Sequence, residues 1–118
     1  MSEQHVGAPD APLIPMPPIT PAALRAAIAQ IAPAHLPSFV KHLDQAVEQA
    51  AAQSTIAPLR TFLQQWGRFV AIQRFPARAA RLRALEDAAA EATDREEVGR
   101  LVSGMMEIID EADREASS

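Results

Sequence analysis

The fold is decided by residues 56–75, IAPLRTFLQQWGRFVAIQRF. Large apolar side chains recur there every three or four residues, the spacing that places them on one face of an α-helix. The stretch also holds the only Trp and three of the four Phe residues: Phe62, Trp66, Phe69 and Phe75. Because aromatic side chains bury large areas, we expect this helix to carry the centre of the hydrophobic core.

The composition favours an all-α protein with a thin core. The chain has 118 residues, no Tyr and four Gly, and its 48% of hydrophobic residues include many Ala. No stretch alternates apolar and polar residues as a half-buried strand does. A chain of this length builds one modest core at most. We therefore predict an all-α domain, a small helical bundle of four to five helices.

Proline and capping residues mark where the first helices begin. Thr20 before Pro21 is expected to cap a helix that ends before Pro33. A second helix is predicted over residues 36–53, with a proline tolerated in its first turn. The short turn that follows favours an antiparallel hairpin of this helix with residues 56–75.

Two further helices are predicted after Pro76. Residues 77–92 are rich in Ala and Arg, so they should be helical by propensity but weakly anchored. Thr93 and Glu96 match a capping box. An apolar stripe then follows at helical spacing: Val98, Leu101, Val102, Met105, Ile108, Ile109 and Ala112. This stripe either folds back onto the hairpin, which we favour because the core is small, or docks on another chain.

Residues 1–19 form a proline-rich arm with five prolines between positions 9 and 18. Such density excludes a helix or a central strand. A disordered leader is the simpler interpretation. The alternative is a stiff strap, PLIPMPP at residues 12–18, that packs along the helices or along a partner. The chain then divides into an extended or disordered arm at 1–19, a helical core at 20–92 and an acidic C-terminal helix at 93–118.

Charge is divided unevenly along the chain. Residues 1–85 hold eight Arg or Lys against four Asp or Glu, whereas residues 86–118 hold three Arg against eleven acids. Five arginines gather at the end of the central helix and in the next one: Arg68, Arg74, Arg78, Arg81 and Arg83. Such a patch could hold nucleic-acid phosphates. We favour pairing with the acidic C-terminal helix, because the compensating charge lies so close.

The sequence offers no catalytic or cofactor chemistry. The absence of Cys excludes disulfides, thiolate metal sites and cysteine nucleophiles. His5 lies in the arm, and His35 and His42 are two helical turns apart, roughly 10 Å, so they cannot share a metal ion. No phosphate-binding or nucleophile motif is present. We expect a protein that is not an enzyme and binds no cofactor, metal or small-molecule substrate. Without a signal peptide or a membrane span, we expect it in the cytoplasm.

Several segments resemble a known family. They are TPAALRAAI at 20–28, FVKHLDQAVEQA at 39–50, and IAPLRTFLQQW at 56–66 followed by Phe75 and Pro76. With the PLIPMPP arm, they are similar to a family of small, all-helical, uncharacterised actinobacterial proteins known only as a domain of unknown function. The resemblance covers about residues 12–85. Some members are encoded beside toxins of the RelE and ParE kind, which implies an antitoxin-like role. The family defines no functional residues.

Three hypotheses of function follow. The first is a small non-catalytic protein-binding module, whose more specific form is the antitoxin-like partner of a basic toxin. Its expected contact residues are Leu101, Met105, Glu107, Ile108, Ile109, Asp110 and Glu111. The second is a DNA-binding transcriptional regulator that uses the Arg68 to Arg83 patch, although the net charge of −4 and the lack of helix-turn-helix spacing disfavour it. The third is a structural protein that associates with itself.

Overall fold

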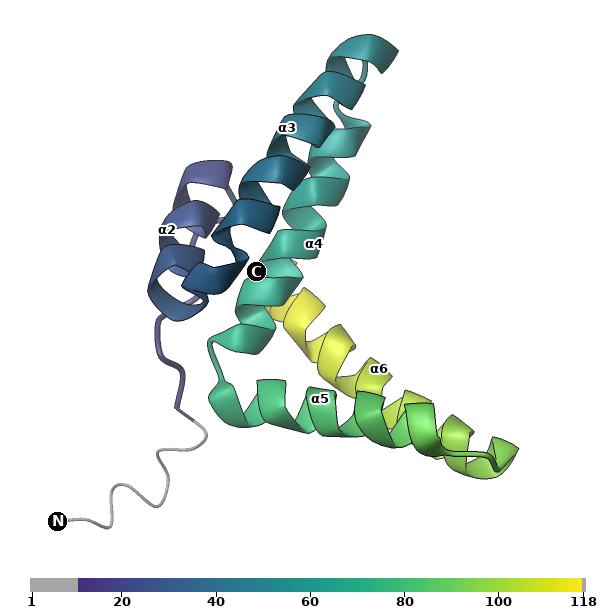
Figure 1. The fold of residues 1–118 in the computed structure, drawn as a ribbon. Coiled ribbons are helices and arrows are strands. Elements are labelled where there is room, and N and C mark those ends of the chain that lie inside the picture. The colour runs from purple at the N-terminus through teal and green to yellow at the C-terminus, as the bar shows by residue number, and fades with distance from the viewer. Residues whose placement is uncertain (1–10, 118) are drawn as a thin grey trace, which may run out of the picture.

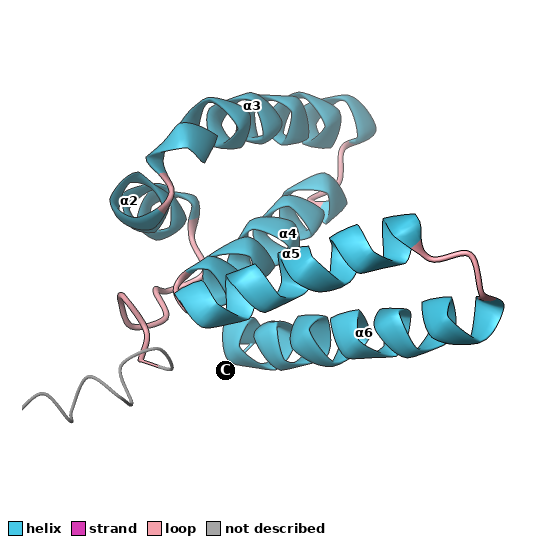
Figure 2. Ribbon diagram, turned by 60° about the horizontal axis from the view of Figure 1, so that its bottom comes forward, coloured by secondary structure: helices cyan, strands magenta, loops and turns pink. Residues whose placement is uncertain are grey.

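A computed structural model describes residues 11–117 as five α-helices, with no strand among these residues (Figures 1 and 2). In chain order the elements are α2 (Pro21–Ile31), the 3-10 turn η2 (Pro33–His35), α3 (Leu36–Gln53), α4 (Ala57–Gln73), α5 (Pro76–Glu91) and α6 (Arg95–Ser117). The prediction of a small all-α bundle is confirmed. None of the described helices combines the length and the apolar character needed to cross a bilayer.

Local sequence sets most helix starts. Proline occupies the first or second position of α2, α3, α4 and α5, where the lost N–H has no helical partner anyway. The Thr20 hydroxyl accepts a hydrogen bond from the Ala23 amide at 3.2 Å, which confirms the predicted cap. The predicted capping box at Thr93 is wrong. Helix α6 begins at Arg95, and the Asp94 carboxylate accepts from the Glu97 amide at 3.2 Å. Asp94 and Glu97 have the same three-residue spacing, and Asp is at least as strong a cap as Thr.

Helix α4 lies at the centre, in contact with each of the other four helices. Helix α3 turns back onto it through Ser54, which closes α3 in the left-handed conformation with φ 53° and ψ 45°. Helices α5 and α6 run side by side as a second hairpin, and the two hairpins diverge as two arms (Figure 1). The predicted α3–α4 hairpin is present.

The first apolar cluster joins α2, α3 and α4. Its buried members are Leu24, Ala27, Ile28, Phe39, Ala46, Phe62, Trp66 and Val70. The ring of Phe39 lies 5.1 Å from that of Phe62 and 5.3 Å, edge to face, from that of Trp66. Such offset aromatic pairs add to the stabilisation that comes from burial alone. The stretch 56–75 therefore carries the core centre expected from its sequence.

A second, smaller cluster joins α4 to α5 and α6. Ala71 and Ile72 of α4 pack against Ile108 and Ala112 of α6. Helix α6 thus folds back onto its own chain, as we favoured from the sequence. Helix α5 contributes partly buried side chains but no fully buried one, in line with the weak anchoring predicted for it.

The described part of the N-terminal arm is a strap. Ile14, Met16 and Ile19 pack against the first cluster, and Met16 also contacts the second. The Leu13 amide donates to the Arg74 carbonyl at 2.7 Å. For residues 11–19 the strap interpretation is therefore right and the disordered leader is wrong. Residues 1–10, with His5, lie outside the described residues.

Candidate functional site

The end of α4, the start of α5 and the last turns of α6 meet in an ion-pair network. Arg68 donates from Nε and Nη2 to the two carboxylate oxygens of Asp113, at 2.7 and 2.9 Å. Glu115 accepts from Arg74 at 2.8 Å and from Arg78 at 2.8 and 3.0 Å. We call these five residues the arginine junction. One carboxylate of α6 therefore accepts from a guanidinium at the C-cap of α4 and from one in α5.

Backbone and ring contacts hold the arginine junction in place. Arg78 donates to the Ala71 carbonyl at 2.9 Å, and Arg74 donates to the strap carbonyl of Ile14 at 3.3 Å. The Phe75 ring lies against both cations, 4.6 Å from the guanidinium carbon of Arg74 and 4.2 Å from that of Arg78. Cation–π attraction favours this placement. Arg74 thereby ties the strap to α4 and α6.

The hydrogen bonds of the arginine junction shift the pKa values of three of its members. Hydrogen bonds from Arg78 are the main cause that lowers the pKa of Glu115; burial opposes them and Arg74 reinforces them. The pKa of Arg68 is raised, chiefly by its hydrogen bonds to Asp113, and that of Arg78 by its hydrogen bonds to Glu115. Acid–base catalysis needs groups that titrate near neutrality. These shifts move the three groups away from neutrality, and the hydrogen bonds that cause them link α6 to α4 and α5.

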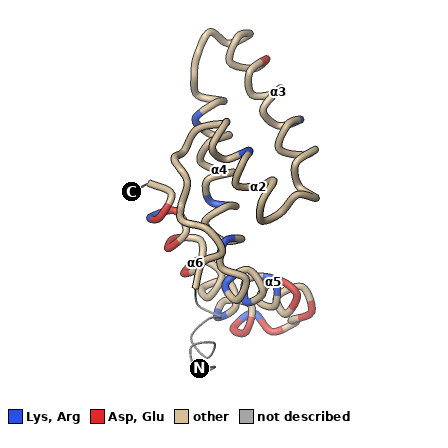
Figure 3. The backbone as a smooth tube through the Cα atoms, turned by 90° about the vertical axis from the view of Figure 1, so that its left-hand side faces the viewer, with Lys and Arg blue, Asp and Glu red and all other residues tan. Residues whose placement is uncertain are grey.

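The predicted basic patch is largely used inside the chain. Pairing with α6 is confirmed for Arg68, Arg74 and Arg78. Arg81 and Arg83 are exposed on α5, and neither forms an ion pair within residues 11–117. Figure 3 shows acidic and basic positions intermixed over α5 and α6. Of the five-residue basic patch expected from the sequence, only these two arginines keep a guanidinium that is not paired with an acid in the described part of the chain.

The predicted contact residues of α6 divide between core and surface. Ile108 is 1% exposed in the second cluster, so in this conformation it is closed to a partner. Leu101, Met105 and Ile109 are half-buried. Glu107, Asp110 and Glu111 are exposed.

Two exposed apolar residues on α6 were missing from the predicted contact residues. Val102 is 42% exposed and Met106 is 46% exposed. They lie one turn apart on the same side of the helix. Together with the half-buried Val98, Met105 and Ile109 they form what we call the outer strip of α6. The signal in the sequence was the width of the apolar stripe, which exceeds what one buried face requires.

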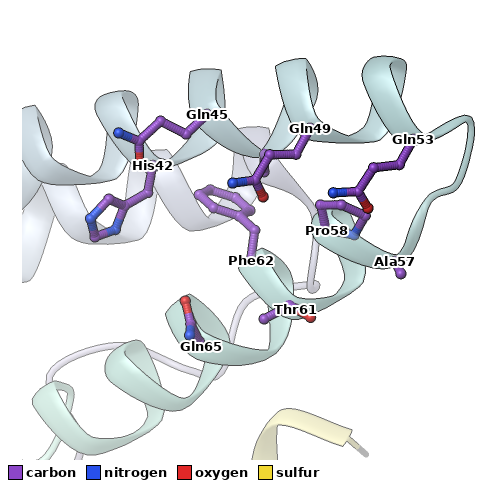
Figure 4. A pocket seen from close by; sticks show the side chains of 10 residues that line it. His42, Gln45, Gln49, Gln53, Ala57, Pro58, Thr61, Phe62 and Gln65 are labelled. Atoms are coloured by element: carbon purple, nitrogen blue, oxygen red, sulfur yellow. The ribbon is translucent and has the colours of Figure 1, made fainter.

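A groove of about 510 Å³ runs between α3 and α4 (Figure 4). Its lining residues are His42, Gln45, Ala46, Gln49, Gln53, Ala57, Pro58, Thr61, Phe62 and Gln65. None of them is Asp, Glu, Lys or Arg. Sequence reasoning missed this groove, although its glutamines recur every fourth residue along α3, a spacing that places them on one helical face.

The two described histidines pack against aromatic rings. His35 lies 4.8 Å from the Phe69 ring, and His42 lies 5.6 Å from that of Trp66. Within the described residues, no group of three or more His, Asp or Glu side chains is placed to hold a metal ion.

The chain matches a known protein family. A family model described as a family of unknown function, DUF6247, matches residues 14–113. The match begins in the strap and ends at Asp113, so it includes most of α6, which the resemblance over residues 12–85 did not cover. No curated protein and no solved structure matches the chain significantly.

Proposed function

Because the chain belongs to a family of unknown function, DUF6247, we propose its role from its own surfaces: it is a non-catalytic protein-binding module that docks a partner on the outer strip of α6. The observation that carries this proposal is the exposure of Val102 and Met106 on a helix that already has a buried face. Their neighbours on the strip are only half-buried. Contiguous exposed apolar residues of this kind are typical of interaction surfaces.

The charge beside the strip indicates the chemistry of the partner. Asp110 lies one turn beyond Met106, and Glu107 is exposed on the same helix. Neither forms an ion pair within the described residues, although the charge of Asp110 also helps to raise the pKa of Arg68, whereas Asp113 and Glu115 are used directly by the arginine junction. A partner segment with apolar residues along one face and Lys or Arg beside them would complement both features. We therefore infer a basic, amphipathic partner segment.

A basic toxin is one protein that offers such a segment. The antitoxin-like form of the proposal is supported by the family resemblance described above and by the acidic character of α6. The DNA-binding alternative has lost most of its support, because three of the five arginines that it requires are bound to α6.

The test is co-expression with the products of the flanking genes, followed by light scattering of the purified material. We expect a hetero-complex with the wild type that is lost in the double variant Val102→Glu, Met106→Glu. Val47→Glu is the matched control, since Val47 is exposed on α3, away from the strip. A monomer without a partner would contradict the proposal, as would a complex that the double variant retains. A homodimer that the double variant dissociates would favour self-association instead.

A further inference from the structure

The groove between α3 and α4 is chemically distinct from the rest of the surface. Charged residues make up 22% of the chain, yet none lines the groove. Four glutamines, Thr61 and His42 supply its polar groups, and Ala46, Ala57, Pro58 and Phe62 supply its apolar ones. A charged ligand would lose hydration there without gaining a counter-charge. A ligand with both donors and acceptors and no net charge fits best.

The glutamines form a regular ladder along α3. Gln45, Gln49 and Gln53 are four residues apart, so successive side chains start roughly 6 Å from each other along the helix axis. In an extended peptide, groups that point to the same side recur every two residues, at about 6.6 Å. The two repeats are close enough for neighbouring glutamines to meet the backbone groups of every second residue of the peptide. The primary amide of Gln donates and accepts, as a peptide unit does.

The opposite wall suits the side chains of such a peptide. Figure 4 shows the three glutamines extending from α3, Thr61 and Gln65 on α4, and the Phe62 ring between the two helices. Because successive residues of an extended chain point to opposite faces, alternate side chains would rest on the half-buried Pro58, beside the Phe62 ring, which is only 3% exposed at the floor of the groove. Three rungs span roughly 12 Å, the length of about four or five extended residues.

We propose that this groove binds an extended, uncharged peptide segment of another protein through the amide ladder of Gln45, Gln49 and Gln53. The inference does not depend on the outer strip of α6. The groove lies between α3 and α4 and presents amide side chains, whereas the outer strip lies on α6 and is apolar. The mode resembles strand addition to a sheet edge, with side-chain amides in place of backbone ones.

The experiment is selection of a phage-displayed library of random linear heptapeptides on the immobilised wild-type protein. Enriched peptides are then synthesised with blocked ends and titrated by calorimetry. Gln49→Leu, which keeps most of the volume but removes both hydrogen-bonding functions, should weaken binding by about tenfold or more. Gln64→Leu is the matched control, because Gln64 is exposed on the same hairpin but outside the groove, and it should leave the affinity unchanged.

We expect the enriched peptides to lack Asp, Glu, Lys and Arg in their central positions. Three results would overturn the proposal: no enrichment, enriched peptides that bind Gln49→Leu as tightly as wild type, or a wild-type dimer that Gln49→Leu dissociates. The last result would make the groove an interface between two copies of the chain. Circular dichroism melts of both variants establish that they fold, as expected for substitutions of exposed residues.

Discussion

At the scale of single residues, Glu115 connects α6 to two arginines. Its carboxylate accepts from Arg74 at the C-cap of α4 and from Arg78 in α5, and its side chain is 24% exposed. Arg74 is 11% exposed, and its buried Nε has no hydrogen-bond partner among the described residues. Burying such a cation is unfavourable unless its other donors are satisfied. The hydrogen bonds that Arg74 donates to Glu115 and to the strap satisfy these other donors.

Loss of the Glu115 charge should therefore destabilise the fold. We expect Glu115→Gln to lower the free energy of unfolding by about 1.5–3 kcal/mol, the range for hydrogen bonds to charged groups. Glu111→Gln is the control, since Glu111 is 55% exposed and 3.6 Å from Arg78, and it should cost at most about 0.5 kcal/mol. Urea unfolding measures both. Equal losses in the two variants would mean that the arginine junction does not anchor α6.

The same carboxylate predicts a pH dependence of definite sign. The pKa of Glu115 is lower in the folded protein than its ordinary value, so its stabilisation is complete above that value and disappears as pH falls through the lowered pKa. The raised pKa values of Arg68 and Arg78 matter only in strong base. The difference in unfolding free energy between wild type and Glu115→Gln should stay constant near neutrality and shrink below about pH 4.3. A difference that grows on acidification would refute this assignment.

At the scale of elements, α6 approaches α5 closely where Gly104 faces Leu85. A Cβ at Gly104 would lie 3.3 Å from Leu85 Cδ1, whereas a Cβ at Gly99 would meet nothing within 4 Å. Gly104 therefore lets the two helices pack closely. Gly99 has no such contact, so its only effect on stability is the low helix propensity of glycine.

The two glycines should respond to substitution in opposite directions. Gly99→Ala should raise the free energy of unfolding by about 0.5–1 kcal/mol, because alanine favours the helix. Gly104→Val should lower it by about 1–3 kcal/mol through crowding against Leu85. Differential scanning calorimetry of both variants is the measurement. Destabilisation by Gly99→Ala would show that residue 99 is not inside a regular helix.

Element boundaries were largely predictable because their causes are local. Prolines at positions 21, 37, 58 and 76 and the hydroxyl of Thr20 act within one turn of themselves. The start of α6 was placed one residue early because Thr93 and Asp94 both have a glutamate three positions on. The sequence pattern alone does not distinguish these two candidate N-cap residues. Which of them caps the helix depends on the backbone conformation at its start.

The strap and the arginine junction depend on contacts between distant parts of the chain. Arg68 and Asp113 are 45 residues apart, and Arg74 and Ile14 are 60 apart. The sequence indicated that opposite charges were available, but which arginine meets which acid depends on how α4 and α6 pack. The sequence shows the repeat of glutamines along α3. Only the packing of α3 against α4 shows that these glutamines form one side of a groove whose other side is α4.

At the scale of the whole molecule, α4 contributes one face to each of two apolar clusters. Trp66 belongs to the first cluster and Ile108 to the second. Both clusters share helix α4, and Met16 of the strap contacts both. A substitution that destabilises the second cluster should therefore destabilise the first one as well. A single cooperative transition is the usual behaviour of a domain of this size.

Ile108→Ala tests that coupling. Removal of this fully buried side chain should cost about 2–5 kcal/mol. If the clusters unfold together, the urea midpoint should fall equally by Trp66 fluorescence and by far-ultraviolet circular dichroism. Phe39→Ala, in the first cluster, should likewise lower the midpoints measured by both probes. A fluorescence midpoint that Ile108→Ala leaves in place would mean that the α5–α6 hairpin unfolds separately.

The long separation between the arginines and their acids also affects synthesis. Glu115 is translated 41 residues after Arg74, a delay of roughly 2–8 s at 5–20 residues per second. During that interval a nascent chain holds the basic end of α4 without its carboxylates, close to a ribosome surface rich in phosphate. The growing chain thus passes through a transiently cationic stage that ends when the acidic helix emerges and folds back.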